Sequence, residues 1–130
     1  PQSSSFSLLM LDLDHFKKIN DKYGHLTGDH VLKEIATILK NSIREEDIVA
    51  RYGGEEFVAL LKDTNYAAAC KVAERIRLNV QNFPFPLLEN SVTISIGVAE
   101  YAPLESMETF LLRSDKALYS AKDQGRNRVC

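Results

Sequence analysis

The feature that most constrains the fold is an apolar run near the start of the chain, Phe6 to Leu13, which reads FSLLMLDL. It lacks the alternation of a strand with one solvated face, so it predicts a central strand buried on both faces of a sheet. Asp12 lies near the end of this run, and Asp14 follows it. A carboxylate at the end of a buried strand is costly unless it is paired or bound to a cation. The end of this strand is therefore the first candidate for a functional site.

A hairpin is predicted around the segment RYGGEEFVALL, residues 51–61. We expect strands at Ile48–Tyr52 and Glu55–Leu61, joined by Gly53 and Gly54, because a Gly-Gly pair suits the positive φ angles of a two-residue turn. The second strand then opens on two adjacent glutamates, which is unusual unless something compensates their charge.

Three carboxylates, Asp12, Glu55 and Glu56, are expected at two strand ends. If the hairpin lies beside the first strand, Asp12 and Glu55 converge at one edge of the sheet, where hard carboxylate oxygens suit Mg²⁺. The alternative is that the glutamates are solvated loop charges, as most charged residues are. The residues alone favour neither interpretation over the other.

Periodicity, capping residues and turn signals predict the remaining elements. Helices are expected at 14–23, 29–43, 65–82, 107–112 and 114–124, with Asp14, Asp29 and Ser114 as N-caps, and further strands at 92–99 and 126–130. The order β-α-α-β-β-α-β-α-β indicates a single α+β domain over residues 1–130. Its predicted architecture is a five-stranded mixed sheet wrapped by helices, with a central βααββ hairpin core.

Composition and charge exclude several classes of function. Sixteen Lys and Arg residues nearly balance eighteen Asp and Glu residues, for a net charge of −2, so the chain lacks the field that duplex DNA or an anionic membrane would attract. No apolar stretch is long enough to span a bilayer, and the two cysteines form neither a metal-binding spacing nor a disulfide framework. We expect a cytoplasmic domain with no nucleic-acid partner, whose full-length protein could be membrane-tethered.

Two segments offer places for a phosphate group. At residues 15–18 (HFKK), a helix start supplies free N–H groups and a dipole that favour an anion, although adjacent lysines are commonly just solvated. Lys122 and Arg126 lie four residues apart around a helix end, where cations also stabilise the helix dipole without any ligand.

Two polar residues, Asn20 and Asp29, lie near Gly24 and Gly28. An amide and a carboxylate together can bind the edge of a purine, with the carboxylate accepting from its N–H groups. Helix capping is the commoner use of both residue types. Taken one at a time, none of these residues is specific.

Together, these segments resemble the GGDEF family of diguanylate cyclases. RYGGEEF is similar to the signature motif in its Glu variant, and LDLDHFKKINDKYGHLTGDHVL, residues 11–32, is similar to the first strand and helices of that family. VTISIGVA and SDKALYSAKDQGRNRV match its later segments in order and spacing, so the resemblance covers Phe6 to Val129. It implies a fold related to the polymerase palm and to nucleotidyl cyclases.

The resemblance also implies a metal site. Asp12, the backbone carbonyl of Leu13 and Glu55 would hold two Mg²⁺ ions per active site, or Mn²⁺ in their place. Glu56 would support the site and help with metal binding or with deprotonation. Asp12, Glu55 and Glu56 are thus the catalytic residues that the resemblance implies.

The substrate implied by the resemblance is GTP. Main chain around His15, Phe16 and Lys17, with Lys122 and Arg126, would hold the triphosphate, Asn20 and Asp29 would bind guanine, and Gly53 and Gly54 would let the nucleotide approach without a Cβ in the way. His15 occupies a position where the family often has an aromatic residue, but the role there is mostly that of the main chain.

The implied reaction condenses two GTP molecules into cyclic di-GMP and two pyrophosphates. One domain holds one GTP, so a homodimer with facing sites is implied. Arg44 and Asp47 stand where the family places its R-x-x-D inhibitory site, and Arg75 stands where it supplies a second arginine. Cyclic di-GMP is therefore expected to act as a feedback inhibitor. The alternative is that this segment is a solvated charged loop.

The sequence departs from the family pattern at its start. The usual leading helix and D-x-L-T segment are lacking, and we expect an upstream sensor domain to be missing as well. A catalytically silent receptor that binds GTP or cyclic di-GMP is the alternative function. The intact segment 53–57 (GGEEF), with Asp12 in place, favours an active cyclase, because a receptor would tolerate the loss of one of these residues.

Overall fold

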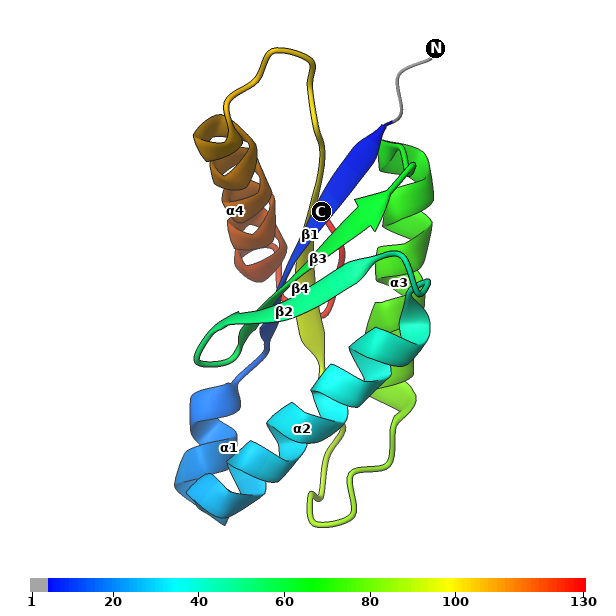
Figure 1. Ribbon diagram of the computed structural model, residues 1–130. Coiled ribbons are helices and arrows are strands. Elements are labelled where there is room, and N and C mark those ends of the chain that lie inside the picture. The colour runs from blue at the N-terminus through cyan, green and yellow to red at the C-terminus, as the bar shows by residue number, and fades with distance from the viewer. Residues whose placement is uncertain (1–4) are drawn as a thin grey trace.

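The computed structural model describes residues 5–130 of the chain. Its elements are β1 (Phe6–Leu13), α1 (Phe16–Tyr23), α2 (His25–Ser42), β2 (Ile48–Gly53), β3 (Glu56–Lys62), α3 (Tyr66–Asn82), β4 (Ile94–Glu100) and α4 (Met107–Asp123) (Figure 1). Within these residues the sheet has four strands in the order β2-β3-β1-β4, and each adjacent pair is antiparallel. The apolar run is thus a central strand, as predicted.

Helices cover both faces of β1, with α4 on one side of the sheet and α3 on the other (Figure 1). Leu9 and Leu11 pack in a core with α2 and α3, whereas Leu8 and Met10 pack with Phe110 of α4. The four β1 side chains are at most 6% exposed, which confirms the prediction of a strand buried on both faces. None of the helices between residues 5 and 130 is long and apolar enough to cross a membrane.

The prediction of a five-stranded mixed sheet is wrong for the described residues. The segment expected as a fifth strand, 126–130, forms only an isolated parallel bridge to Ile96 in β4. The Ile96 N–H donates to the Arg128 carbonyl at 3.0 Å. Arg126 and Asn127 have positive φ angles of 66° and 47°, so extended backbone begins too late to form a strand.

Two predicted N-caps are also wrong. α1 begins at Phe16 and α2 at His25, so neither Asp14 nor Asp29 caps a helix. Asp14 accepts hydrogen bonds from other parts of the chain instead, and Asp29 lies one turn inside α2 on the surface. The N-cap position of α1 is His15, which has left-handed backbone with φ of 58°.

The two short helices expected at 107–112 and 114–124 form one helix, α4. Its N-cap is Ser106, whose hydroxyl accepts a main-chain N–H bond at 3.0 Å. Ser114 lies buried in the middle of the helix and donates to the Phe110 carbonyl at 3.0 Å. A serine that bonds within its own helix does not start a new one.

Candidate functional site

The end of β1 brings together the carboxylates that the sequence placed at two strand ends. Asp12 lies opposite Glu56 of β3 and opposite Ser95 of β4 in the sheet register. The Leu13 N–H donates to the Glu55 carbonyl at 3.4 Å, so the turn that carries Glu55 lies directly beside the strand end. Antiparallel pairing of β1 and β3 therefore gathers all three acids at one edge.

The hairpin turn is shifted by one residue from the prediction. β2 extends to Gly53 and β3 begins at Glu56, so the two turn residues are Gly54 and Glu55. The Gly54 carbonyl accepts from Arg51 Nε at 2.8 Å. Apart from the adjoining residues, no atom of residues 5–130 lies within 4 Å of where a Cβ on Gly53 or Gly54 would stand. This side of the turn is open to a ligand.

Asp12 is the most buried of these carboxylates. Its side chain is 3% exposed and forms an ion pair with Lys122 through Oδ2. Its Oδ1 is buried and finds no hydrogen-bond partner among residues 5–130. Burial raises the pKa of Asp12 above its usual range, and the Lys122 amine opposes that rise. A cation at Oδ1 would remove this uncompensated cost.

Glu55 adds a second carboxylate at the same place. Burial raises the pKa of Glu55, the negative charge of Asp12 raises it further, and the charge of Lys122 lowers it. A bound cation would relieve this effect of the Asp12 charge on Glu55.

The donor set at this point fits a magnesium ion that is completed by a substrate. Within residues 5–130, no group of three or more His, Cys, Asp or Glu side chains is placed to hold a metal ion. The candidate ligands predicted from the sequence, Asp12, Glu55 and the Leu13 main-chain carbonyl, lie together at the end of β1. Mg²⁺ usually binds through one or two carboxylates and keeps further positions for waters and substrate phosphates. The unpartnered Asp12 Oδ1 supports this fit.

The start of α1 has the free donors of an anion site. In the described structure its N-cap residue, His15, makes no side-chain capping bond. Phe16 is buried, whereas Lys17 is exposed with its amine 3.3 Å from the Asp21 carboxylate. The first N–H groups of a helix carry partial positive charge, so main-chain donors are available here.

The two cations predicted to bind phosphate lie at the same end of β1. Lys122 belongs to the last turn of α4 and is held on Asp12. Arg126 is exposed and follows in a turn with positive φ angles. Burial raises the pKa of Asp12, and the charges of Lys122 and Arg126 both oppose that rise. The Arg126 charge therefore acts on the Asp12 carboxylate.

The residues predicted to bind guanine lie on neighbouring helices. A Cβ on Gly28 of α2 would stand 1.8 Å from Asn20 Oδ1 of α1, so this glycine makes room for the amide. That oxygen is buried with no partner in the described part of the chain. Asp29 is exposed and lines a cavity of about 420 Å³, together with Arg51 and Phe57. Asn20 does not line this cavity.

Asp14 is the residue of this region whose position the sequence did not predict. It is 5% exposed and accepts hydrogen bonds from the Ser95 hydroxyl (2.6 Å), the Thr93 hydroxyl (2.7 Å) and the Asn127 N–H (3.0 Å). It thereby joins the end of β1 to β4 and to the turn after α4. The only signal in the sequence is a second carboxylate directly after a buried strand.

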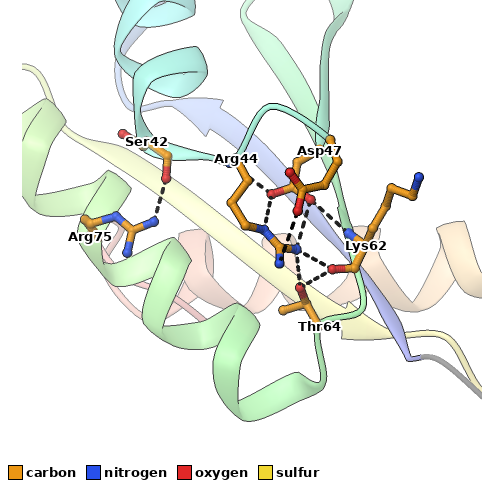
Figure 2. Close-up of polar contacts among 7 residues, drawn as sticks. Ser42, Arg44, Asp47, Lys62, Thr64 and Arg75 are labelled. Atoms are coloured by element: carbon orange, nitrogen blue, oxygen red, sulfur yellow. Dashed lines mark hydrogen bonds and ion pairs between the residues drawn. The ribbon is translucent and has the colours of Figure 1, made fainter.

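A second polar cluster lies where Lys62 of β3 pairs with Phe6, at the other end of β1. Arg44 donates from Nε and Nη2 to the Asp47 carboxylate (3.1 Å each) and from Nη2 to Thr64 Oγ1 (3.1 Å) and the Lys62 carbonyl (Figure 2). Burial would raise the pKa of Asp47, but hydrogen bonds from Arg44 and the Lys62 N–H bring it below its usual range. This loop is therefore folded onto the sheet rather than simply solvated.

Arg75 lies close to this cluster without bonding to it. Its Nη2 donates to the Ser42 carbonyl at 2.6 Å (Figure 2). Arg44, Asp47 and Arg75 nevertheless line one cavity of about 400 Å³. The three residues predicted for an inhibitory site thus share a cavity, at the opposite end of β1 from the carboxylates.

The fold and the site define an α+β domain with an acidic centre at the end of its central strand, beside a Gly-Gly-Glu-Glu hairpin. A family model described as diguanylate cyclase, GGDEF domain, matches residues 1–128. The chain therefore belongs to the GGDEF domain family of diguanylate cyclases.

Curated relatives are similar over almost the whole chain. Diguanylate cyclase A of Treponema denticola is 50% identical over 98% of this chain and 35% of its own length. The response regulator PleD of Caulobacter vibrioides is 47% identical over 95% of this chain and 28% of its own length. The chain thus spans about a third of the length of these relatives.

Solved structures share the fold. The active GGEEF domain of a diguanylate cyclase from Vibrio cholerae has a TM-score of 0.92 and 36% identity, and the match covers 98% of this chain and 82% of that one. The GGDEF domain of DgcB from Caulobacter crescentus, in complex with c-di-GMP, has a TM-score of 0.90 and 37% identity, over 97% and 77% of the two chains.

Proposed function

We propose that this domain condenses two GTP molecules into cyclic di-GMP and two pyrophosphates. The observation that carries the proposal is the pair of carboxylates at the end of β1, Asp12 and Glu55, with one buried Asp12 oxygen that has no partner within residues 5–130. Family membership supports the same chemistry, because relatives named diguanylate cyclases are up to 50% identical.

The carboxylates have the first role in this proposal. Asp12, Glu55 and the Leu13 carbonyl would hold two Mg²⁺ ions, or Mn²⁺ in their place. When bound, these cations lower the pKa of a ribose 3′-hydroxyl and stabilise charge on the α-phosphate. Glu56, half-buried in β3 beside them, supports the site or accepts a proton. The chain itself keeps these oxygens in place, because β1 is paired on both sides.

The triphosphate would lie against the start of α1. Main-chain N–H groups at His15, Phe16 and Lys17 donate to it, and Lys122 and Arg126 balance its charge. Lys122 neutralises Asp12 in the structure. A cation bound to Asp12 would neutralise this carboxylate in place of Lys122, and the Lys122 amine would then be free to bind the phosphates. Binding of the metal and binding of the nucleotide would therefore support each other.

Guanine would be bound by Asn20 and Asp29. The buried Asn20 Oδ1 lacks a donor within the described residues, and a purine N–H would satisfy it. Asp29 can accept from two N–H groups of guanine, whereas the corresponding edge of adenine has a different order of donors and acceptors. Gly53 and Gly54 leave the main chain accessible beside the nucleotide.

The reaction requires two copies of the domain. Because one domain holds one GTP, two domains must face each other across a two-fold axis, so a homodimer is part of the proposal. The chain spans 35% of the length of diguanylate cyclase A of Treponema denticola and 28% of the length of PleD of Caulobacter vibrioides. We place control of dimerisation in an upstream sensor domain of the full-length protein.

Cyclic di-GMP is proposed to inhibit the reaction through Arg44, Asp47 and Arg75. The cavity of about 400 Å³ that these residues share supports this assignment, as does the complex of the DgcB domain with c-di-GMP. A guanidinium can bind a guanine edge or a phosphate with two parallel hydrogen bonds. Because the cavity lies at the other end of β1, inhibition should be non-competitive with GTP.

The test of the proposed function is incubation with GTP and Mg²⁺, followed by chromatography and mass spectrometry of the product. Cyclic di-GMP should form from GTP, and no cyclic product should form when ATP replaces it. Equal use of both nucleotides would contradict the guanine-binding role of Asn20 and Asp29. GTP binding without turnover would favour a catalytically silent receptor instead.

A further inference from the structure

The turn that follows α4 carries Arg126 in a strained conformation. Gly125, Arg126 and Asn127 have consecutive positive φ angles of 123°, 66° and 47°. Glycine adopts such angles freely and asparagine tolerates them, but for arginine they are costly. A backbone of this kind persists only where the surrounding structure holds it.

The side chain of Asn127 ties this turn to α3. Its Oδ1 accepts from Arg77 Nη1 at 2.9 Å, and its Nδ2 donates to Gln81 Oε1 at 3.3 Å. Arg77 is itself fixed by two bonds to the Glu74 carboxylate, at 2.8 and 2.6 Å. The turn is therefore anchored to two residues that lie one helical turn apart.

The main chain of Asn127 ties the turn to the end of β1. Its N–H donates to Asp14, whose carboxylate is buried and also bonded by the Thr93 and Ser95 hydroxyls. Asp14 is therefore fixed to β4 as well. Asn127 is held from two sides, by α3 through its amide and by Asp14, just after β1, through its backbone, and Arg126 directly precedes it.

We propose that Asn127 is a positioning residue, which holds Arg126 in its strained conformation so that the guanidinium faces the carboxylate end of β1. The inference rests on the proposed function, in which Arg126 binds the triphosphate. Asn127 itself need not touch the nucleotide. A cation that is already in place when the nucleotide arrives binds it more tightly, because less motion is lost on binding.

The test is the affinity for GTP with Mg²⁺, measured by calorimetry on the whole chain. Asn127→Ala should weaken GTP binding roughly tenfold, the scale of one misplaced charge-assisted contact, with the circular dichroism spectrum unchanged. Arg77→Leu, which removes the donor from α3, should weaken GTP binding in the same direction. Lys71→Gln removes a charge from an exposed position of the same helix and should leave GTP affinity unchanged.

Guanosine separates this role from a general loss of structure. It lacks the phosphates that Arg126 would bind, so its affinity, measured by competition with a fluorescent GTP analogue, should be the same for Asn127→Ala and the wild type. If Asn127→Ala does not fold, the same measurements are made on Asn127→Gly. Glycine lacks the same side-chain amide but adopts positive φ angles freely.

A double variant decides whether Asn127 acts through Arg126. In an Arg126→Gln background, Asn127→Ala should cause no further loss of GTP affinity. An equal loss in both backgrounds, or no loss in either, would overturn the positioning role while the proposed function stands. If the wild type binds no GTP at all, the proposed function and this inference are both wrong.

Discussion

At the scale of residues, the candidate site depends on which carboxylate oxygens already have donors. Asp14 and Asp12 are both buried, yet hydrogen bonds from three groups hold Asp14. Asp12 has Lys122 on one oxygen and, within residues 5–130, nothing on the other. These two acids, only two positions apart in the sequence, therefore have different roles. Asp14 fixes the structure, and Asp12 is open to a cation.

Glu55→Gln tests the metal-binding role of Glu55. The amide keeps the shape of the side chain but removes a negative oxygen, so GTP turnover should fall roughly a hundredfold or more. The melting temperature should not fall, because burial and the charge of Asp12 raise the pKa of Glu55 and thus already disfavour its ionised form. Asp115→Asn, the same change at an exposed position of α4, is the control. Near-full activity of Glu55→Gln would remove Glu55 from the metal site.

At the scale of elements, sequence prediction succeeded where the signal is local. The bounds of β1 agree with the predicted run, because six of its eight residues are apolar and a run of this length favours a buried strand over a helix. The hairpin and the long helix α3 are also close to prediction, since glycines and an Asn65 cap mark their ends. The convergence of Asp12 and Glu55 follows from the pairing of β1 with β3, two strands whose bounds were predicted to within one residue.

Prediction failed where distant residues decide the structure. Asp14 looks like a helix cap, but its partners Thr93, Ser95 and Asn127 lie 79 to 113 residues further along the chain. Ser114 looks like a helix start, but packing buries it in the middle of α4. The left-handed backbone of Arg126 and Asn127, which prevents a fifth strand, likewise depends on bonds to α3 and β1.

The loop between β4 and α4 gives an element-scale prediction about pH. Hydrogen bonds from Arg113 (2.6 Å) and the Ala102 N–H (3.0 Å) lower the pKa of Glu105 to about 2, from an ordinary 4.5. Because the pKa is lower in the folded state, this contribution to stability is complete above the ordinary pKa and disappears as pH falls toward 2. Glu105→Gln should melt below the wild type at neutral pH, and the two melting temperatures should converge in acid.

Thermal unfolding followed by circular dichroism over a pH series measures this difference. If the gap between wild type and Glu105→Gln stays constant down to the lowest pH, the ion pair is not the source of the stability.

At the scale of the whole molecule, two candidate sites lie at opposite ends of the paired strands β1 and β3. Their register places Asp12 opposite Glu56 at one end and Phe6 opposite Lys62 at the other. The carboxylates gather at the first end, and the cluster of Arg44 lies at the second (Figure 2). In the proposed function, a ligand at the second end would act on the pairing of two domains without entering the first site.

Arg44→Ala tests this separation. It should weaken cyclic di-GMP binding by about 1–3 kcal/mol, the scale of a lost charge-assisted contact, and leave the rate of cyclic di-GMP formation unchanged at low product. Calorimetry with the product compares the variant with the wild type and with Lys116→Gln, an exposed charge loss on α4. If all three bind cyclic di-GMP equally well, Arg44 belongs to the loop structure alone.

The most direct test of the central claim is to measure cyclic di-GMP and pyrophosphate formed from GTP and Mg²⁺ over a range of protein concentrations. We predict two pyrophosphates for each cyclic di-GMP, and a specific activity that rises with protein concentration, because two domains must meet, each holding one GTP. The absence of cyclic di-GMP at every concentration, in protein that binds GTP, would contradict the cyclase and leave a nucleotide-binding domain without turnover.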